Sequence, residues 1–345
     1  MMIIMENKKN KKNKKNVSLP RVSICTPTFN RRPFFKGLIE SVLSQKYPKE
    51  LIEWVIVDDG TDKIGDLVSH IPFVKYVSVD EHMPLGKKRN FMHKECTFKE
   101  DDAIIVYMDD DDYYPPERVS HAVDKLIHSN ALCSGSSELY IWFNTLDKMY
   151  KFGPYGPNHS TAGTFAFKRS LLKSTHYEDD AVLAEEKHFL KNYTVPFVQL
   201  DPLKTILVFS HEQNTFDKRR LVDVNNPFCK ESALKVNHFI KSEEMRNFYM
   251  TDLNNLIKDY EPGDIKNKPN VLEEIKRRDK MRAEMANQQQ VSITNPDGTK
   301  RVLSQPEIIE ALKMKTDEVA MLRDELDKKN KYIKLLSEKL RQKSD

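Results

Sequence analysis

The amino-acid sequence predicts an α/β domain whose central sheet is mostly parallel and is flanked by helices. Short apolar segments alternate with segments whose apolar residues recur every three or four positions, as on one face of a helix. The segments 51–57 and 103–108 are apolar at nearly every position, which is typical of strands buried on both faces of a parallel sheet. The order strand, helix, strand is characteristic of α/β folds.

The first half of this domain contains four expected strands separated by helices. In chain order, we expect strands at 17–25, 51–57, 74–79 and 103–108, and helices at 33–44, 86–96 and 117–128. Three of the four strands run directly into polar segments, at 26–30, 58–62 and 109–112. Since ligands bind beyond the carboxyl ends of the strands in such sheets, the three polar segments predict one binding site.

The second half shows shorter and less regular elements. We expect a hairpin at 138–144 and 148–152, strands at 164–167, 195–200 and 205–209, helices at 181–192, 234–260 and 271–290, and a hairpin at 291–303. The last forty residues differ, because apolar residues at 312, 319, 326, 333 and 340 are seven positions apart. This heptad pattern predicts a coiled coil and a homo-oligomer through 312–340, although Lys315 and Lys329 interrupt the second seam position. The alternative is one amphipathic helix docked on the preceding domain.

The net charge of +4 comes from the N-terminus. Residues 1–16 contain six lysines and one glutamate, so they supply +5 and the remaining 329 residues sum to −1. We therefore predict no specific nucleic-acid partner and interpret 1–16 as a disordered, solvated tail. The alternative for the tail is a basic patch that contacts phosphate or a membrane surface.

The cysteines and the hydropathy of the sequence indicate the cellular compartment of the protein. The four cysteines include no close pair, which argues against a disulfide framework and against a zinc site, and favours free thiols in a reducing compartment. No apolar run approaches the roughly 18 residues of a membrane span. We therefore expect a cytoplasmic protein without a transmembrane segment. Its Lys-, Asn- and Ile-rich ends are typical of an AT-rich genome, such as that of a large virus or a parasite.

Four consecutive aspartates at 109–112 directly follow the strand expected at 103–108. Adjacent carboxylates repel one another, and a cation or water relieves that repulsion. Mg²⁺ and Mn²⁺ prefer oxygen ligands and commonly keep water and substrate phosphate in their other positions. Because the strand fixes where the carboxylates point, we interpret this run as a site for a divalent cation. The alternative is a solvated acidic loop.

Two further segments suit a nucleotide. Asp58 and Asp59 follow the second expected strand, and one of them could accept a hydrogen bond from a nucleobase N–H, although Asp-Asp-Gly is also an ordinary turn. The segment 86–90 places three cations at an expected helix start, where anionic phosphate is favoured. Its alternative is a solvated basic face. Together, the segments supply base recognition, phosphate neutralisation and a metal, as a nucleotide diphosphate requires.

On these segments the sequence resembles the family 2 glycosyltransferases, which have the GT-A fold, over roughly Pro20 to Arg220. The segments similar to family motifs are 27–31 (Pro-Thr-Phe-Asn-Arg), 53–61 (Glu-Trp-Val-Ile-Val-Asp-Asp-Gly-Thr), Gly86–Asn90, 107–115 with its Asp-rich DxD motif, 184–187 (Ala-Glu-Glu-Lys) and 211–215 (His-Glu-Gln-Asn-Thr). The resemblance implies a Rossmann-like, mostly parallel mixed sheet flanked by helices, here with a helical and coiled-coil extension at the C-terminus.

The resemblance also implies roles for individual residues. Nucleotide binding is implied for Pro27, Thr28, Phe29, Asn30, Arg31, Asp58, Asp59, Lys87, Arg89, Asn90, Asp109 and Asp110. Asp111, Asp109 and His211 are the implied ligands of Mn²⁺ or Mg²⁺. Glu186 is the implied catalytic base, with Glu185 as the alternative because this chain has Glu-Glu where the family has Glu-Asp. The extra aspartate leaves the DxD motif open between 109–111 and 110–112.

The implied activity is metal-dependent, inverting sugar transfer from a nucleotide-diphosphate donor, with a UDP-sugar favoured, to a hydroxyl of a carbohydrate or glycosylated acceptor. The glycine-rich segment 153–163 is the candidate acceptor loop. The alternatives are a sugar nucleotidyltransferase, a phosphatase with Asp58 or Asp109 as nucleophile, and a non-enzymatic coiled-coil scaffold.

The same reasoning divides the chain into five parts. We expect a disordered tail at 1–16, a GT-A domain at 17–220, a helical extension at 221–260, a polar helix and hairpin linker at 261–303, and a coiled coil at 304–345.

Overall fold

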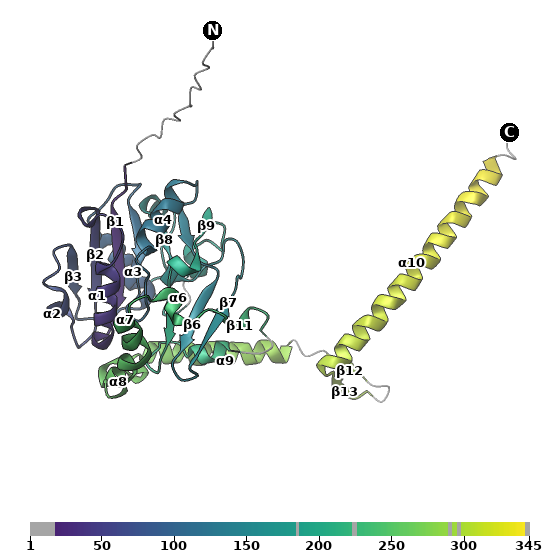
Figure 1. Ribbon diagram of the computed structural model, residues 1–345. Helices are drawn as coiled ribbons and strands as arrows, with labels where there is room; N and C mark the ends of the chain where they lie inside the picture. The colour runs from purple at the N-terminus through teal and green to yellow at the C-terminus, as the bar shows by residue number, and fades with distance from the viewer. Residues whose placement is uncertain (1–17, 184–185, 223–225, 289–291, 295–297, 342–345) are drawn as a thin grey trace, which may run out of the picture. The chain divides into compact units, whose positions relative to one another are not determined.

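The computed structural model in Figure 1 describes residues 18–183, 186–222, 226–288, 292–294 and 298–341. The chain forms two compact units, of which the first ends at Glu274 and the second begins at Ile275. The tail predicted at 1–16 lies outside the described residues. Within the described ranges, no helix is both long enough and apolar enough to cross a membrane.

The first unit is built on a seven-stranded mixed sheet in the order β3-β2-β1-β4-β8-β5-β9. The strands are β1 (Val22–Thr28), β2 (Ile52–Asp58), β3 (Val74–Ser78), β4 (Ile104–Tyr107), β5 (Cys133–Gly135), β8 (Ala166–Lys168) and β9 (Phe197–Gln199). Strands β1 to β4 pair in parallel, β8 runs antiparallel to its neighbours β4 and β5, and β5 pairs in parallel with β9. The predicted fold class, a mostly parallel mixed sheet, is confirmed.

Helices cover both faces of this sheet because alternate strand residues point to opposite sides. Ile24 of β1 joins a core that includes side chains of α1 (Phe35–Leu43), α2 (Gly65–Val68) and α4 (Arg118–Ile127). The next residue, Cys25, joins a second core that includes side chains of α3 (Leu85–Glu95) and α5 (Glu186–Phe189). The completely buried strand β2 is therefore apolar on both faces, as its sequence predicts.

A second, four-stranded sheet has the order β10-β6-β7-β11. Its strands are β6 (Leu139–Phe143), β7 (Lys148–Phe152), β10 (Val208–Ser210) and β11 (Cys229–Glu231). A third core joins side chains of β6, β7 and β10 to α6 (Val236–Phe239), α7 (Glu243–Asn247) and α8 (Leu253–Lys258). This core holds the C-terminal part of the first unit against the sheet.

Several expected elements differ in extent. Of the described residues in the helix expected at 181–192, only those of α5 are helical, because residues 191–193 take left-handed backbone angles that end it. The single helix expected at 234–260 is three short helices, with a π-helical turn at Phe248–Asp252 between the last two. Strands β5 and β11 were not predicted, since three residues are too few to show a periodicity.

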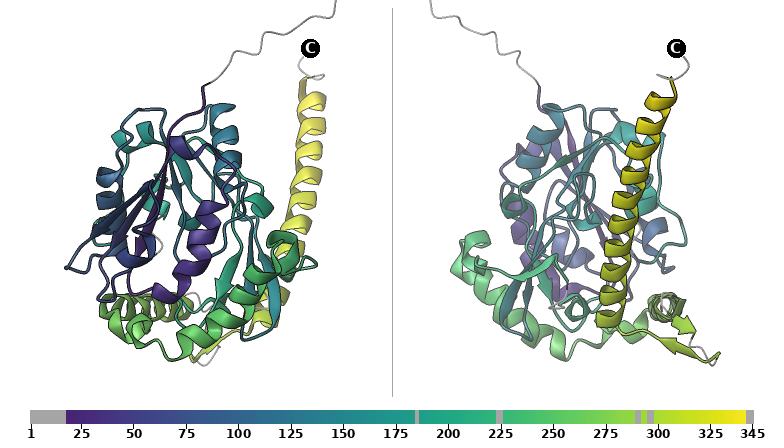
Figure 2. Two further views of the ribbon diagram at one scale, coloured as in Figure 1. Left: turned by 60° about the vertical axis from the view of Figure 1, so that its left-hand side comes forward. Right: turned by 90° about the vertical axis from the view of Figure 1, so that its right-hand side faces the viewer.

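The second unit contains most of α9 (Pro269–Gln288), the antiparallel hairpin of β12 (Ser292–Thr294) and β13 (Lys300–Val302), and the helix α10 (Gln305–Arg341), which is long and continuous in Figure 2. The seam side chains of Leu312, Leu326 and Ile333 are 63%, 58% and 59% exposed in the single chain. An apolar stripe of this kind is the surface that a coiled-coil partner covers.

We expect the seam of α10 to drive self-association. A chain ending at residue 300 should be monomeric, whereas the full chain should form a modest dimer or trimer, because Lys315 and Lys329 weaken the seam. Light scattering on both chains provides the measurement. A monomeric full-length protein would rule out the coiled coil, and an oligomeric shorter chain would move the interface to the first unit.

Candidate active site

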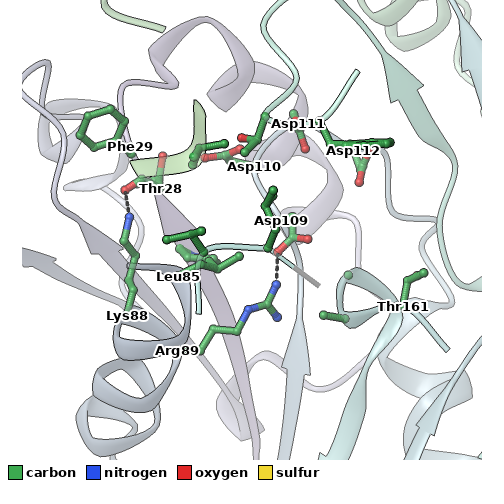
Figure 3. A pocket seen from close by; sticks show the side chains of 18 of the residues that line it. Thr28, Phe29, Leu85, Lys88, Arg89, Asp109, Asp110, Asp111, Asp112 and Thr161 are labelled. Carbon is green, nitrogen blue, oxygen red and sulfur yellow. Dashed lines mark hydrogen bonds and ion pairs between the residues drawn. The ribbon is translucent and has the colours of Figure 1, made fainter. Parts of the chain in front are cut away.

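A cavity of about 450 Å³ opens at the carboxyl ends of β1 and β4. This is where the sequence places the site, and Figure 3 shows Arg89 directed toward Asp109 and Lys88 directed toward Thr28. The lining residues come from the segments 27–31, 82–89, 109–112, 139–141, 161–163, 182–186, 206–221 and 268–271. The last two segments come after β9, the last strand of the seven-stranded sheet in sequence, so the cavity combines the early α/β core with a wall from the C-terminal part of the first unit.

The end of β1 and the loop that follows it line the cavity with four of the five predicted residues of 27–31, namely Pro27, Thr28, Phe29 and Arg31. Asn30 takes φ 53°, and its Oδ1 accepts hydrogen bonds from the amides of Thr61 (2.7 Å) and Asp62 (2.9 Å). Asn30 is not among the lining residues, and its hydrogen bonds tie this loop to the turn that contains Thr61 and Asp62.

The two acids after β2 are also engaged within the protein. Asp58 is fully buried and accepts hydrogen bonds from the Gly60 amide (2.9 Å), the Ile64 amide (3.0 Å) and the Tyr76 hydroxyl (2.8 Å), which occupy both carboxylate oxygens. Asp59 accepts from the Met83 amide (2.7 Å) and forms an ion pair with Lys88. Neither acid is among the residues that line the cavity, and both carboxylates are engaged by hydrogen bonds within the protein.

The basic residues of helix α3 lie on different faces of the helix and therefore differ in burial. Lys88 and Arg89 are buried and line the cavity, whereas Lys87 is exposed and is not among the lining residues. Lys88 Nζ donates to the Thr28 carbonyl (3.1 Å), and Arg89 lies 3.8 Å from Asp109 (Figure 3). Asn90 instead donates to the Tyr177 carbonyl (2.8 Å). The sequence analysis counted Lys88 among the three cations of 86–90, whereas the resemblance implied a nucleotide contact for Lys87 and Arg89 only; the spacing of the apolar residues at 85 and 92 places Lys88 on the inner face of the helix.

The four aspartates after β4 have different surroundings. Asp110 and Asp111 lie 3.8 and 3.9 Å from the Arg31 guanidinium, and Asp112 Oδ1 accepts from the Phe209 amide (3.1 Å). Burial, reinforced by the charge of Asp111, raises the pKa of Asp110 to about 7. Although burial opposes it, the hydrogen bond with His211, with help from nearby cations, holds the pKa of Asp111 well below its usual range. The carboxyl group of Asp111 therefore ionises more readily than that of Asp110.

Gly163 allows the loop after β7 to approach Asp109 closely. A Cβ at residue 163 would lie 2.9 Å from Asp109 Oδ2. The fully buried Arg118 holds this loop in place, since its Nη2 donates to the carbonyls of Thr164 (2.8 Å) and Phe165 (2.7 Å). Of the candidate acceptor loop at 153–163, only Thr161, Ala162 and Gly163 line the cavity.

We expect Gly163→Ala to lower activity by about 100-fold while leaving the fold intact. The added methyl group must push the mobile end of the Asp109 side chain, and a misplacement of about 1 Å has a cost of this order. Turnover and the midpoint of thermal unfolding provide the measurement. Unchanged turnover would show that the position of Asp109 is unimportant, and a large fall in the midpoint would make the effect structural.

Glu186, the first residue of α5, also lines the cavity. Its Oε1 accepts a hydrogen bond from the Ala162 amide (3.1 Å), which fixes the carboxylate beside the candidate acceptor loop. Glu185, the alternative base, lies outside the described residues.

The described residues include no group of three or more His, Cys, Asp or Glu side chains that are close enough together to hold a metal ion. Two of the predicted ligands nevertheless fit a divalent cation. His211 Nε2 lies 3.3 Å from Asp111 Oδ2, and its buried Nδ1 makes no hydrogen bond. Burial lowers the pKa of His211 to about 4, so the imidazole is neutral at physiological pH and retains a lone pair. Asp109, the third predicted ligand, faces Arg89 instead.

Lys268 is a cavity residue that sequence reasoning missed. It precedes α9, about 240 residues after Phe29, and its ammonium nitrogen lies 5.8 Å from the centre of the Phe29 ring. Nothing in the local sequence distinguishes this lysine from its many exposed neighbours, because only the tertiary fold brings it to the site.

Residues 23–182 match the family model described as Glycosyl transferase family 2. None of the curated protein sequences compared with the chain matches it.

Solved structures similar to this chain include two of TarS from S. aureus. The first has a TM-score of 0.44 and 18% identity, over 58% of this chain and 38% of TarS. The second, TarS 1–349 in complex with UDP-GlcNAc, has a TM-score of 0.42 and 20% identity over 56% and 59% of the two chains.

A third similar structure is the mannosyltransferase PcManGT from Pyrobaculum calidifontis in complex with GDP-Man and Mn²⁺. Its TM-score is 0.44, with 19% identity over 55% of this chain and 56% of that chain. The chain thus spans 38% to 59% of the length of these three structures.

Proposed function

Because this chain belongs, through residues 23–182, to the family 2 glycosyltransferases, we propose that it transfers a sugar from a nucleotide-diphosphate donor to an acceptor hydroxyl, with inversion at the anomeric carbon. The observation that carries the proposal is the cavity at the ends of β1 and β4, where acids and buried cations converge. Arg31, Lys88 and Arg89 supply positive charge for the diphosphate, and the Phe29 ring supplies an apolar face for the base. A UDP-sugar is the donor we favour.

In this proposal Asp111 and His211, with Asp109 after a shift of its side chain, hold Mg²⁺ or Mn²⁺. When bound, the cation neutralises negative charge on the departing diphosphate. The fit rests on an ionised carboxylate and a neutral imidazole that already lie 3.3 Å apart. The engagement of Asp112 with the Phe209 amide favours 109–111 as the DxD motif.

Glu186 is the proposed general base. The acceptor hydroxyl gives its proton to the free carboxylate oxygen of Glu186 while its oxygen bonds to the anomeric carbon. The bond from that carbon to the diphosphate oxygen breaks on the opposite face, so the electron pair leaves with the diphosphate and the product is inverted. The hydrogen bond from the Ala162 amide keeps Glu186 oriented during this step.

Three further parts of the proposal extend beyond the family match. We propose a carbohydrate or glycosylated acceptor beside Thr161–Gly163, a cytoplasmic location, and a catalytic part that includes the expected domain at 17–220 and extends to the cavity residues at 268–271. The phosphatase alternative with Asp58 as nucleophile is not favoured, because both oxygens of that carboxylate accept hydrogen bonds from the surrounding loop.

Incubation with a panel of UDP- and GDP-sugars in the presence of Mn²⁺ tests the proposal. We expect one donor to be hydrolysed slowly, with the released sugar in the anomeric configuration opposite to that of the donor, as proton NMR records. Release of the same anomer would overturn inversion. No turnover of any donor, together with a phosphorylated aspartate after incubation with phosphate esters, would replace the proposal with a phosphatase.

A further inference from the structure

Lys268 is a buried cation inside the proposed donor cavity, and it comes from a segment beyond the family match. Lys268 is 8% exposed, and its Nζ donates a hydrogen bond to Thr215 Oγ1 (3.0 Å). Among the residues that the structure describes, no carboxylate forms an ion pair with it. The cavity cations Arg31, Lys88 and Arg89 differ in this respect, since each lies within 4 Å of an aspartate.

An ammonium group buried without a counter-ion is costly, because it has lost most of its hydration. Burial lowers the pKa of Lys268 to about 7, and the charge of Arg31 adds to this effect. The nearby carboxylates of Asp110 and Asp111 oppose the lowering, but both already lie beside Arg31. An anionic ligand in the cavity would supply the missing counter-charge.

The backbone that carries Lys268 is held against the nucleotide loops. Asn30 Nδ2 donates to the Pro262 carbonyl (3.0 Å), and the Tyr260 hydroxyl donates to Asp62 Oδ2 (2.7 Å). Gln213 Nε2 adds two bonds of 2.8 Å, to the carbonyls of Ile257 and Tyr260. The position of Lys268 over the cavity is therefore built into the fold and does not depend on a flexible surface side chain.

We propose that Lys268 binds the diphosphate of the donor, so that the segment 260–271 completes the donor site from outside the family match. This inference rests on the proposed function. It gives Asn30, which the sequence predicted as a nucleotide contact, a different role, because Asn30 ties the loop that carries Phe29 to the segment that carries Lys268. It also implies that a chain ending near residue 220 lacks part of its donor site.

Calorimetric titration of the full chain with UDP and with uridine, in the presence of Mn²⁺, tests this assignment. If the wild type prefers GDP, then GDP and guanosine replace them. We expect Lys268→Met to weaken diphosphate binding by about tenfold to 100-fold, the loss expected for a charge-assisted hydrogen bond, and to leave nucleoside binding unchanged. Lys266→Met is the matched control, because Lys266 is two residues away and its side chain is 62% exposed. This control should bind both ligands as the wild type does.

The thermal unfolding midpoint without ligand separates a binding role from a structural one. Removal of a buried, unpaired charge should leave the midpoint of Lys268→Met unchanged or raise it, whereas a structural lysine would lower it. Equal loss of UDP and uridine binding, or wild-type affinity for UDP, would overturn the assignment while the proposed function stands. If the wild type binds no nucleoside diphosphate and hydrolyses no nucleotide sugar, the proposed function fails as well.

Discussion

Asp111→Asn should weaken Mn²⁺-dependent binding of UDP by at least about 100-fold, because even an outer partner of a metal ligand contributes 10- to 100-fold to metal affinity. The substitution keeps the size of the side chain and removes its charge. Calorimetry with and without Mn²⁺ provides the measurement. In the wild type the metal should strengthen UDP binding, and in the variant it should have little effect.

Asp112→Asn is the matched control for this prediction. The two acids are adjacent in sequence, yet Asp112 Oδ1 accepts from the Phe209 amide, and burial raises the pKa of Asp112 well above its usual range. An asparagine oxygen can accept the same hydrogen bond, so metal-dependent binding should persist. If Asp112→Asn abolishes the metal effect and Asp111→Asn does not, the motif is 110–112. Equal UDP affinity of the wild type with and without metal would remove the metal site altogether.

The sequence predicted the sheet and the location of the site because both depend on local patterns. Continuous apolar runs identify β2 and β4 as buried strands, and polar residues directly after them identify the edge where a ligand binds. The predicted positions of most strands agree with the structure for the same reason. The helix expected at 181–192 was too long: Phe189 and Leu190 pack in the core as expected, but of the described residues in this range only Glu186–Phe189 is helical.

Which polar residue faces the ligand could not be predicted from position alone. Asp58 ends β2 and Asn30 follows β1 at the carboxyl edge of the sheet, but the tight turns around them leave several amide groups that need acceptors, and these two side chains supply the acceptors. Helical spacing places Lys88 on the inner face of α3, whereas no local sequence pattern indicates that Lys268 is buried. Its neighbours in space lie more than fifty residues away along the chain, so it became visible only in the folded structure.

Glu186→Gln should lower sugar transfer by about 10²- to 10⁴-fold and leave donor binding unchanged. Glutamine has the same shape, and its side-chain oxygen can still accept the hydrogen bond that the Ala162 amide donates to Glu186 (3.1 Å). The variant therefore keeps its orientation in the cavity and loses only the ability to take a proton from the acceptor hydroxyl. Transfer rates under saturating donor, together with the UDP affinity from calorimetry, provide the measurement.

Glu185→Gln decides between the two adjacent acids. If Glu186 is the base, the Glu185 variant should retain nearly full transfer, because the neighbouring carboxylate still accepts the proton. A large loss in Glu185→Gln and none in Glu186→Gln would transfer the role to the preceding residue. If both variants transfer sugar at the wild-type rate, the cavity holds no carboxylate base at this position, and direct displacement with inversion loses the group that makes the acceptor oxygen nucleophilic.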